Sequence, residues 1–93
     1  MKRRLLQSPR FKRRLRAWLK AHPETSRDIE SALETLANDD ADPSLKTHKL
    51  RGPLSECWAC SAGYNLRVVF EYVEDEGGEA IRLLTLGTHD EVY

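Results

Sequence analysis

The spacing of hydrophobic residues along this chain changes at Pro43, and this change constrains the fold more than any other feature of the sequence. Before Pro43, apolar side chains recur at the spacing of one helix face, as in Phe11, Leu15, Trp18 and Leu19. After Pro43, the clearest segment is the β-branched and aromatic run at residues 66–73, which is typical of a strand. Helices followed by strands predict an α+β fold, with a helical hairpin packed on one face of a small antiparallel sheet.

Two helices are predicted in the first half of the chain. Ser8-Pro9 favours a helix start, because serine caps helices and proline suits the first helical position. Pro23 follows within a few residues of the end of this helix. A second helix is predicted from Thr25 or Ser26 to the polar stop at residues 38–43. Its predicted buried face consists of Ile29, Ala32, Leu33, Leu36 and Ala37.

Four strands are predicted in the second half, at residues 47–50, 56–62, 66–73 and 80–86. Short connections, including a hairpin loop at residues 74–79, favour an antiparallel meander. The pair Leu5-Leu6 is a candidate for an additional edge strand. With 93 residues, the whole chain 1–93 is predicted to form one domain.

The formal net charge is zero, but the charge is unevenly distributed along the chain. Residues 1–20 carry nine of the fifteen basic side chains and no acidic one, whereas residues 24–42 carry seven acids and one base. Residues 71–79 add five more acids. A polyanion could therefore meet a basic face despite the neutral total. The alternative is that the N-terminal basic run is only a solvated helix face.

The chain has no apolar run near the ~20 residues that cross a bilayer, and no signal-peptide pattern, so a cytoplasmic protein without membrane contact is expected. Cys57 and Cys60 form a CxxC pair, the spacing of redox and zinc sites. Their segment is a predicted strand, where positions three apart point to opposite faces. No second CxxC is present to complete a zinc site. We therefore predict free thiols, and neither a metal nor a cofactor.

The strongest chemical indication is a pair of histidines, each beside a predicted strand. His48 opens the segment His-Lys-Leu-Arg-Gly, and His89 follows the last strand. Imidazole transfers protons well near neutral pH, because its ordinary pKa is ~6.5. Arg67 interrupts an apolar strand, so it either pairs with a carboxylate or faces a concave site. Structural interpretations remain open: His89 as a strand-end cap, His48 as an exposed loop residue, and Trp58 as core rather than an RNA platform.

The order and spacing of these segments resemble the RelE/ParE toxin superfamily, and in particular its YafQ-like mRNA interferases. The resemblance covers nearly the whole chain: two N-terminal helices, His-Lys-Leu-Arg-Gly, Trp58, the strand Leu-Arg-Val-Val-Phe, and a closing Gly-Thr-His-x-x-x-aromatic. It implies a toxin of a type II toxin–antitoxin system, a metal-free endoribonuclease that cleaves mRNA in the ribosomal A site. It also implies a cognate antitoxin that covers the site, with a monomeric free toxin and a hetero-oligomeric complex.

The resemblance assigns roles to residues of this chain. His48 matches a family histidine, Arg67 the arginine on the scissile phosphate, and His89 the general acid. Tyr93 matches an aromatic residue near the RNA. Lys46, Lys49 and Arg51 are further candidates for RNA contacts.

The chain departs from the family pattern at residues 62–65, where YafQ-like proteins carry an additional histidine and aspartate; these are absent here. Two other functions remain open, a ParE-like inhibitor of DNA gyrase and a passive RNA-binding module that uses residues 1–20.

Overall fold

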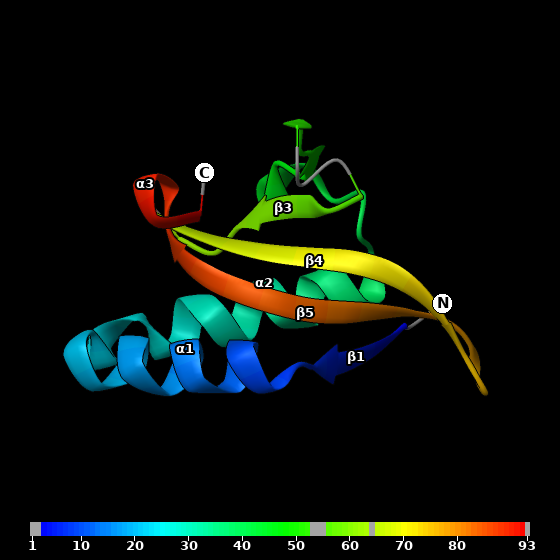
Figure 1. Cartoon of the computed structure of the whole chain (residues 1–93). Helices are drawn as coiled ribbons and strands as arrows, with labels where there is room; N and C mark the ends of the chain where they lie inside the picture. The colour runs from blue at the N-terminus through cyan, green and yellow to red at the C-terminus, as the bar shows by residue number, and fades with distance from the viewer. Residues whose placement is uncertain (1–2, 53–55, 64, 93) are drawn as a thin grey trace.

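The computed structural model describes residues 3–52, 56–63 and 65–92 (Figure 1). The helices are α1 (Pro9–Ala21), α2 (Ser26–Asn38) and α3 (His89–Val92), with 3₁₀ turns η1 (Pro23–Thr25) and η2 (Pro43–Leu45). The strands are β1 (Arg4–Gln7), β2 (His48–Lys49), β3 (Trp58–Ser61), β4 (Leu66–Asp75) and β5 (Gly78–Thr88). The predicted α+β class is confirmed. Within the described ranges, no helix combines the length and apolar character that crossing a membrane requires.

The five strands form one sheet in the order β1-β5-β4-β3-β2. Strands β2 to β5 pair antiparallel in sequence, which confirms the predicted meander. The edge strand at Leu5-Leu6 also forms, but it runs parallel to β5, so the sheet is mixed. A parallel pairing is possible because both helices and the rest of the sheet lie between the two strands along the chain.

Helix α1 begins where the sequence predicts, because Ser8 caps it locally. The Ser8 hydroxyl oxygen accepts a hydrogen bond from the Phe11 amide at 3.1 Å. Strand β1 ends at Gln7, opposite Leu83, and α1 then continues along the edge of β5. The Ser8 amide donates to Leu83 O at 3.1 Å, and the Ser8 hydroxyl donates to Leu84 O at 3.1 Å. The start of α1 therefore satisfies part of the β5 edge that β1 leaves unpaired.

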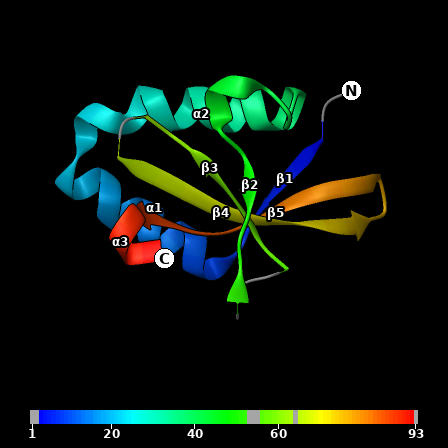
Figure 2. The same cartoon turned by 90° about the horizontal axis from the view of Figure 1, so that it is seen from above.

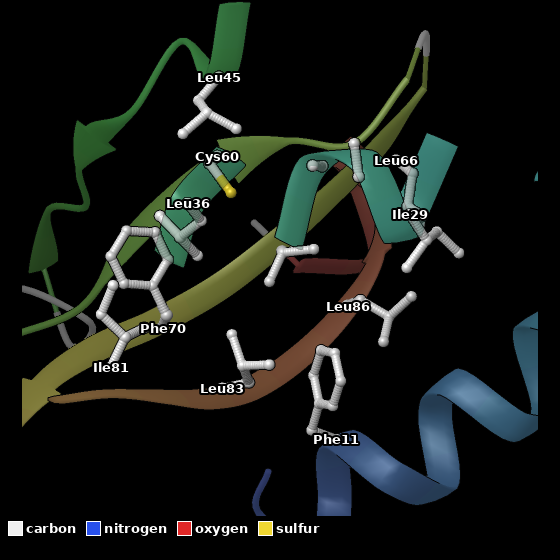
Figure 3. Packing of buried hydrophobic residues seen from close by; sticks show 13 residues of the cluster. Phe11, Ile29, Leu36, Leu45, Cys60, Leu66, Phe70, Ile81, Leu83 and Leu86 are labelled. Atoms are coloured by element: carbon white, nitrogen blue, oxygen red, sulfur yellow. The ribbon is translucent and has the colours of Figure 1, made fainter. Parts of the chain in front are cut away.

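The main core lies between the helices and one face of the sheet. Figures 1 and 2 show α1 and α2 along the same side of β4 and β5. Figure 3 shows Phe11 from α1 and Leu36 from α2 directed toward the side chains of the central strands. The sheet contributes Cys60, Leu66, Val68, Phe70, Ile81, Leu83 and Leu86. Of the predicted helix face, Leu33 is only partly buried.

The β4–β5 hairpin is longer than predicted. Glu74 pairs with Glu79 and Asp75 with Gly78, so only two residues, Glu76 and Gly77, connect the strands. The expected loop at residues 74–79 is therefore mostly strand. Gly78 has φ of +109°, a conformation that glycine adopts without a Cβ clash, and this allows the tight turn.

Strand β5 contains an irregularity near its middle. Phe70 pairs with Leu83 and Val69 with Thr85, which leaves Leu84 as an extra residue. Such a bulge changes which side chains of the later strand face each side of the sheet. As a result, Leu83 and Leu86 both reach the main core, although they are three residues apart.

Candidate functional site

The sheet face opposite α1 and α2 carries the predicted site residues His48 and Arg67, and is called the open face below. Strand alternation directs Leu66, Val68 and Phe70 of β4 into the main core. Arg67 and Val69 therefore project from the open face. Directly opposed residues of neighbouring strands share a face, so the pairing extends this assignment to Ala59 and Ser61 on β3 and to Thr85 and Gly87 on β5.

His48 lies on the open face. It pairs with Ala59, which pairs with Val69, which pairs with Thr85, and these four residues form one row across the sheet. The His48 ring nitrogen Nδ1 lies 3.0 Å from the Lys46 carbonyl oxygen. A carbonyl only accepts, so this contact requires a proton on Nδ1. In the neutral ring, the basic lone pair is then on Nε2.

Arg67 occupies the neighbouring row, between Ser61 and Gly87. Its Nη1 donates to Leu66 O at 3.2 Å, and it makes no ion pair with any carboxylate in the part of the chain that the structure describes. Arg67 and Lys46 line a hollow of about 510 Å³ together with Ser61 and Asn65. Of the two interpretations from the sequence, the described structure favours Arg67 facing a concave site.

His89 begins α3, a short helix that the sequence did not predict. Thr88 and Glu91 cap it reciprocally: the Thr88 amide donates to Glu91 Oε1 at 2.8 Å, and the Glu91 amide donates to Thr88 Oγ1 at 3.4 Å. The Thr88 amide holds the pKa of the Glu91 carboxyl below its usual value. The His89 side chain is 62 % exposed, and its Nδ1 lies 3.6 Å from Asp90 Oδ1.

Helix α3 bends back over the open face. Val92 is buried there in a second apolar cluster with Leu50, Ala59 and Val69. Figure 1 shows α3 on the side of the sheet opposite α1. Gly87 allows this close approach, since a Cβ at that position would lie 3.1 Å from the Glu91 Cβ. The same face of the sheet therefore carries His48, Arg67 and α3, the helix that begins with His89.

The other residues predicted to contact RNA do not gather at one place in the described structure. Lys49 pairs with Trp58, so it lies on the opposite face of β2 from His48, and its Nζ is 5.9 Å from the Trp58 ring centroid. Trp58 packs against the main core, as predicted. Arg51 is exposed after β2. Tyr93 lies outside the described residues.

The two cysteines lie in different clusters, as expected, but the strand predicted at residues 56–62 is only Trp58–Ser61, so Cys57 precedes it. Cys60 is buried in the main core, and burial raises the pKa of its thiol to about 12. Cys57 packs against the open-face cluster instead, and both are free. In the described ranges, no group of three or more His, Cys, Asp or Glu side chains could hold a metal ion.

A larger hollow on the open face contains residues that the sequence analysis did not assign to a site. It measures about 750 Å³, and four arginines line it: Arg10, Arg13 and Arg14 from α1, and Arg82 from β5. It is called the arginine hollow below. The i, i+3, i+4 spacing of the α1 arginines predicts a shared helix face. No sequence signal placed Arg82 opposite them.

Solved structures of bacterial toxins share this fold. YafQ from E. coli matches with a TM-score of 0.79 and 14% identity, over 99% of this chain and 99% of that chain. YafQ in the E. coli DinJ-YafQ toxin-antitoxin complex matches with a TM-score of 0.78 and 15% identity, over 100% and 99% of the two chains. A YoeB/ParE toxin from Agrobacterium tumefaciens matches with a TM-score of 0.75 and 12% identity, over 92% and 98%.

These matches confirm the predicted fold, which is the YafQ-like fold of the RelE/ParE toxins. No protein-family model matches the sequence, and no curated protein matches it.

Proposed function

We propose that this protein is a toxin of a type II toxin–antitoxin system, a YafQ-like endoribonuclease that cleaves mRNA on the ribosome and so acts in the cytoplasm. The observation that carries the proposal is the common face of His48, Arg67 and α3 in a chain with this toxin fold. RNA supplies its own nucleophile, the 2′-oxygen, so the protein needs only a base, an acid and a cation at the phosphate.

His48 is the proposed general base. Its Nδ1–H donates to the Lys46 carbonyl, which orients the ring and leaves Nε2 as the nitrogen that accepts a proton. When Nε2 takes the proton of the 2′-hydroxyl, the 2′-oxygen attacks the adjacent phosphorus. A bond from the 2′-oxygen to phosphorus then forms as the bond to the 5′-oxygen breaks.

His89 is the proposed general acid, which gives its proton to the departing 5′-oxygen. The products are a 2′,3′-cyclic phosphate and a 5′-hydroxyl. In its protonated form, the imidazole is within ion-pair distance of the Asp90 carboxylate. The reciprocal cap between Thr88 and Glu91 fixes the start of the helix from which His89 projects. Acid–base catalysis of this kind contributes about 10²–10⁴-fold, and positioning of the message by the ribosome would supply more.

Arg67 is the proposed clamp for the scissile phosphate. Negative charge grows on the phosphoryl oxygens in the transition state, and a guanidinium binds two such oxygens at once. Arg67 suits this role because it pairs with no carboxylate in the described structure and lines a hollow with Lys46. Lys49, Arg51 and Tyr93 remain proposed RNA contacts.

We also propose a cognate antitoxin as partner, with a free monomeric toxin and a hetero-oligomeric complex. The support is the likeness to YafQ in a complex with the antitoxin DinJ.

The test is to map the 5′ ends of a message translated in vitro with the purified protein. Wild type is expected to create new 5′-hydroxyl ends, and His89→Ala and Arg67→Gln each to lower their yield by 10²-fold or more, since each removes a catalytic group. Arg16→Gln is the matched control for Arg67→Gln, because Arg16 is exposed on α1 and lines neither of the two hollows described above. Circular dichroism checks that all variants fold.

If His89→Ala and Arg67→Gln cleave as fast as wild type, the assigned residues are wrong. If wild type leaves messages intact on translating ribosomes but blocks supercoiling by DNA gyrase, the ParE-like alternative replaces the nuclease.

A further inference from the structure

We propose that the arginine hollow is a second RNA site, which binds the backbone phosphates of a nucleotide outside the one that reacts. This inference rests on the proposed function, since it names where the same RNA continues on the protein. The hollow includes none of the three proposed catalytic residues His48, Arg67 and His89.

Two of the four arginines are held in position by the protein. Arg14 Nε donates to Leu86 O at 3.3 Å, and its Nη2 lies 3.5 Å from Glu91 Oε2. Arg82 Nη1 lies 3.8 Å from Glu71 Oε1. These contacts fix two walls of the hollow before any ligand arrives, which lowers the ordering cost of binding.

The other two arginines are not paired with a carboxylate in the described structure. Arg10 and Arg13 are exposed on α1, and neither forms an ion pair within the described ranges of the chain. Among the described residues, Glu91 is the only acidic side chain that lines the hollow, and it lies beside Arg14. The hollow therefore keeps a net positive charge, with two guanidinium groups available for an anion.

The floor of the hollow is mostly apolar and continues the row that contains His48. Val69, Leu84 and Val92 line it, beside Thr85. Val69 and Thr85 belong to the same cross-strand row as His48, and Thr85 is three strands away from it. At 4.7–4.9 Å between neighbouring strands, this separation is about 14 Å. A nucleotide in the hollow would thus be distinct from the one at His48 but could belong to the same strand of RNA.

This combination suits a nucleotide better than a simple anion. Guanidinium groups bind phosphate in a fork, and an apolar floor accepts the face of a base or ribose. A volume of about 750 Å³ is sufficient for a nucleotide, since ordinary ligand sites span roughly 300–1,000 Å³. An acidic peptide would meet the same arginines, but the shared row with His48 favours RNA.

The test measures binding of a short, fluorescently labelled RNA whose riboses are all 2′-O-methylated, so that cleavage is impossible. Fluorescence anisotropy is recorded with the purified protein over a series of salt concentrations. The test variant is R10Q/R13Q, and the matched control is K12Q/R16Q, which removes the same charge from exposed positions of α1 that do not line the hollow. R82Q tests the opposite wall, which belongs to the sheet.

Each phosphate contact to single-stranded RNA contributes about 0.7 to the slope of log K against log salt. R10Q/R13Q is therefore expected to lower the slope by about 1.4 and the affinity at 0.1 M salt by roughly 25-fold. R82Q is expected to lower the affinity by roughly fivefold. K12Q/R16Q is expected to change it by less than about twofold, because screening weakens charges that make no contact.

Equal losses in R10Q/R13Q and K12Q/R16Q would overturn the proposal, because the effect would then be long-range charge alone. No RNA binding by wild type would also overturn it. So would displacement of the RNA by a polyglutamate peptide of equal charge at a lower concentration than unlabelled RNA requires, since the hollow would then be a peptide site. These outcomes do not depend on cleavage, so the second site and the proposed catalytic residues can fail separately.

Discussion

We predict that Tyr72→Phe destabilises the protein because it removes one hydrogen bond, from the Tyr72 hydroxyl to the Asp40 carboxylate. The Tyr72 hydroxyl donates to Asp40 Oδ2 at 2.5 Å, and Arg3 lies 2.6 Å from the other oxygen of the same carboxylate. Phenylalanine keeps the ring, which makes edge-to-face contacts with Trp58 at 5.8 Å and Phe70 at 5.6 Å between centroids. The substitution therefore removes the hydroxyl and little else.

The expected cost follows from the charge and exposure of the acceptor. Hydrogen bonds to charged groups contribute about 1.5–3 kcal/mol. Asp40 is 26% exposed, so water replaces part of the lost interaction, and we expect about 1.5–2 kcal/mol at pH 7. For a domain of this size, that loss lowers the melting temperature by roughly 6–16 °C. Urea unfolding followed by tryptophan fluorescence measures the free energy directly.

The free-energy cost of Tyr72→Phe is also expected to depend on pH, because the acceptor of the hydrogen bond is a carboxylate. The Tyr72 hydroxyl lowers the pKa of the Asp40 carboxyl below its ordinary value of 3.8. A group with a lowered folded-state pKa stabilises the protein above its unfolded pKa and loses that contribution as the pH falls through the folded value. The penalty of Tyr72→Phe is thus full at pH 7 and smaller at pH 3 and below.

A double-mutant cycle with Asp40→Ala isolates the interaction between the two side chains. The coupling energy is expected to exceed about 1 kcal/mol, since the hydroxyl has no other acceptor in the described structure once the carboxylate is removed. A coupling below about 0.5 kcal/mol, the margin within which independent sites add, would refute the reasoning. A penalty that stays constant from pH 7 to pH 3 would refute the electrostatic part.

Three further predictions concern the core, the thiols and the C-terminal helix. Phe11→Ala is expected to cost about 3–5 kcal/mol in urea unfolding, because Phe11 is fully buried between α1 and the sheet; a cost below about 1 kcal/mol would contradict this packing. An aromatic disulfide reagent at pH 8 is expected to modify Cys57 in the native protein but Cys60 only after unfolding, because burial raises the Cys60 pKa to about 12; equal rates would contradict the burial. Glu91→Gln weakens the reciprocal cap with Thr88, so the backbone amides of α3 are expected to exchange hydrogen faster than in wild type, and unchanged exchange would show that the cap does not hold the helix.

Features of the fold that are set by residues close together in the sequence were predicted correctly. The start of α1 needs only Ser8 and Pro9, whose cap and ring act within one helical turn. The strand at residues 66–73 is set by its β-branched and aromatic side chains, and the observed β4 extends it by two residues. The separate environments of Cys57 and Cys60 were expected from strand alternation, although Cys57 lies just before β3.

Features that depend on contacts between distant residues were not predicted. Helix α3 has four residues, too few to be stable by propensity, and it is held by Val92 on the open face and by Glu91 near Arg14. The parallel pairing of β1 with β5 joins segments more than seventy residues apart. The same limit applies to the arginine hollow, because no local pattern brings Arg82 beside Arg13.

Internal ion pairs also explain how a chain of zero net charge can carry a basic site. Two basic residues near the N-terminus are paired with acids elsewhere in the fold: Arg3 pairs with Asp40 and Glu79, and Arg4 pairs with Asp75 at 2.6 Å. Three arginines of α1, Arg10, Arg13 and Arg14, instead line the arginine hollow on the open face. Because exposed charges act mainly within a Debye length of about 8–10 Å, the local balance at the hollow governs what binds there, and the total charge does not.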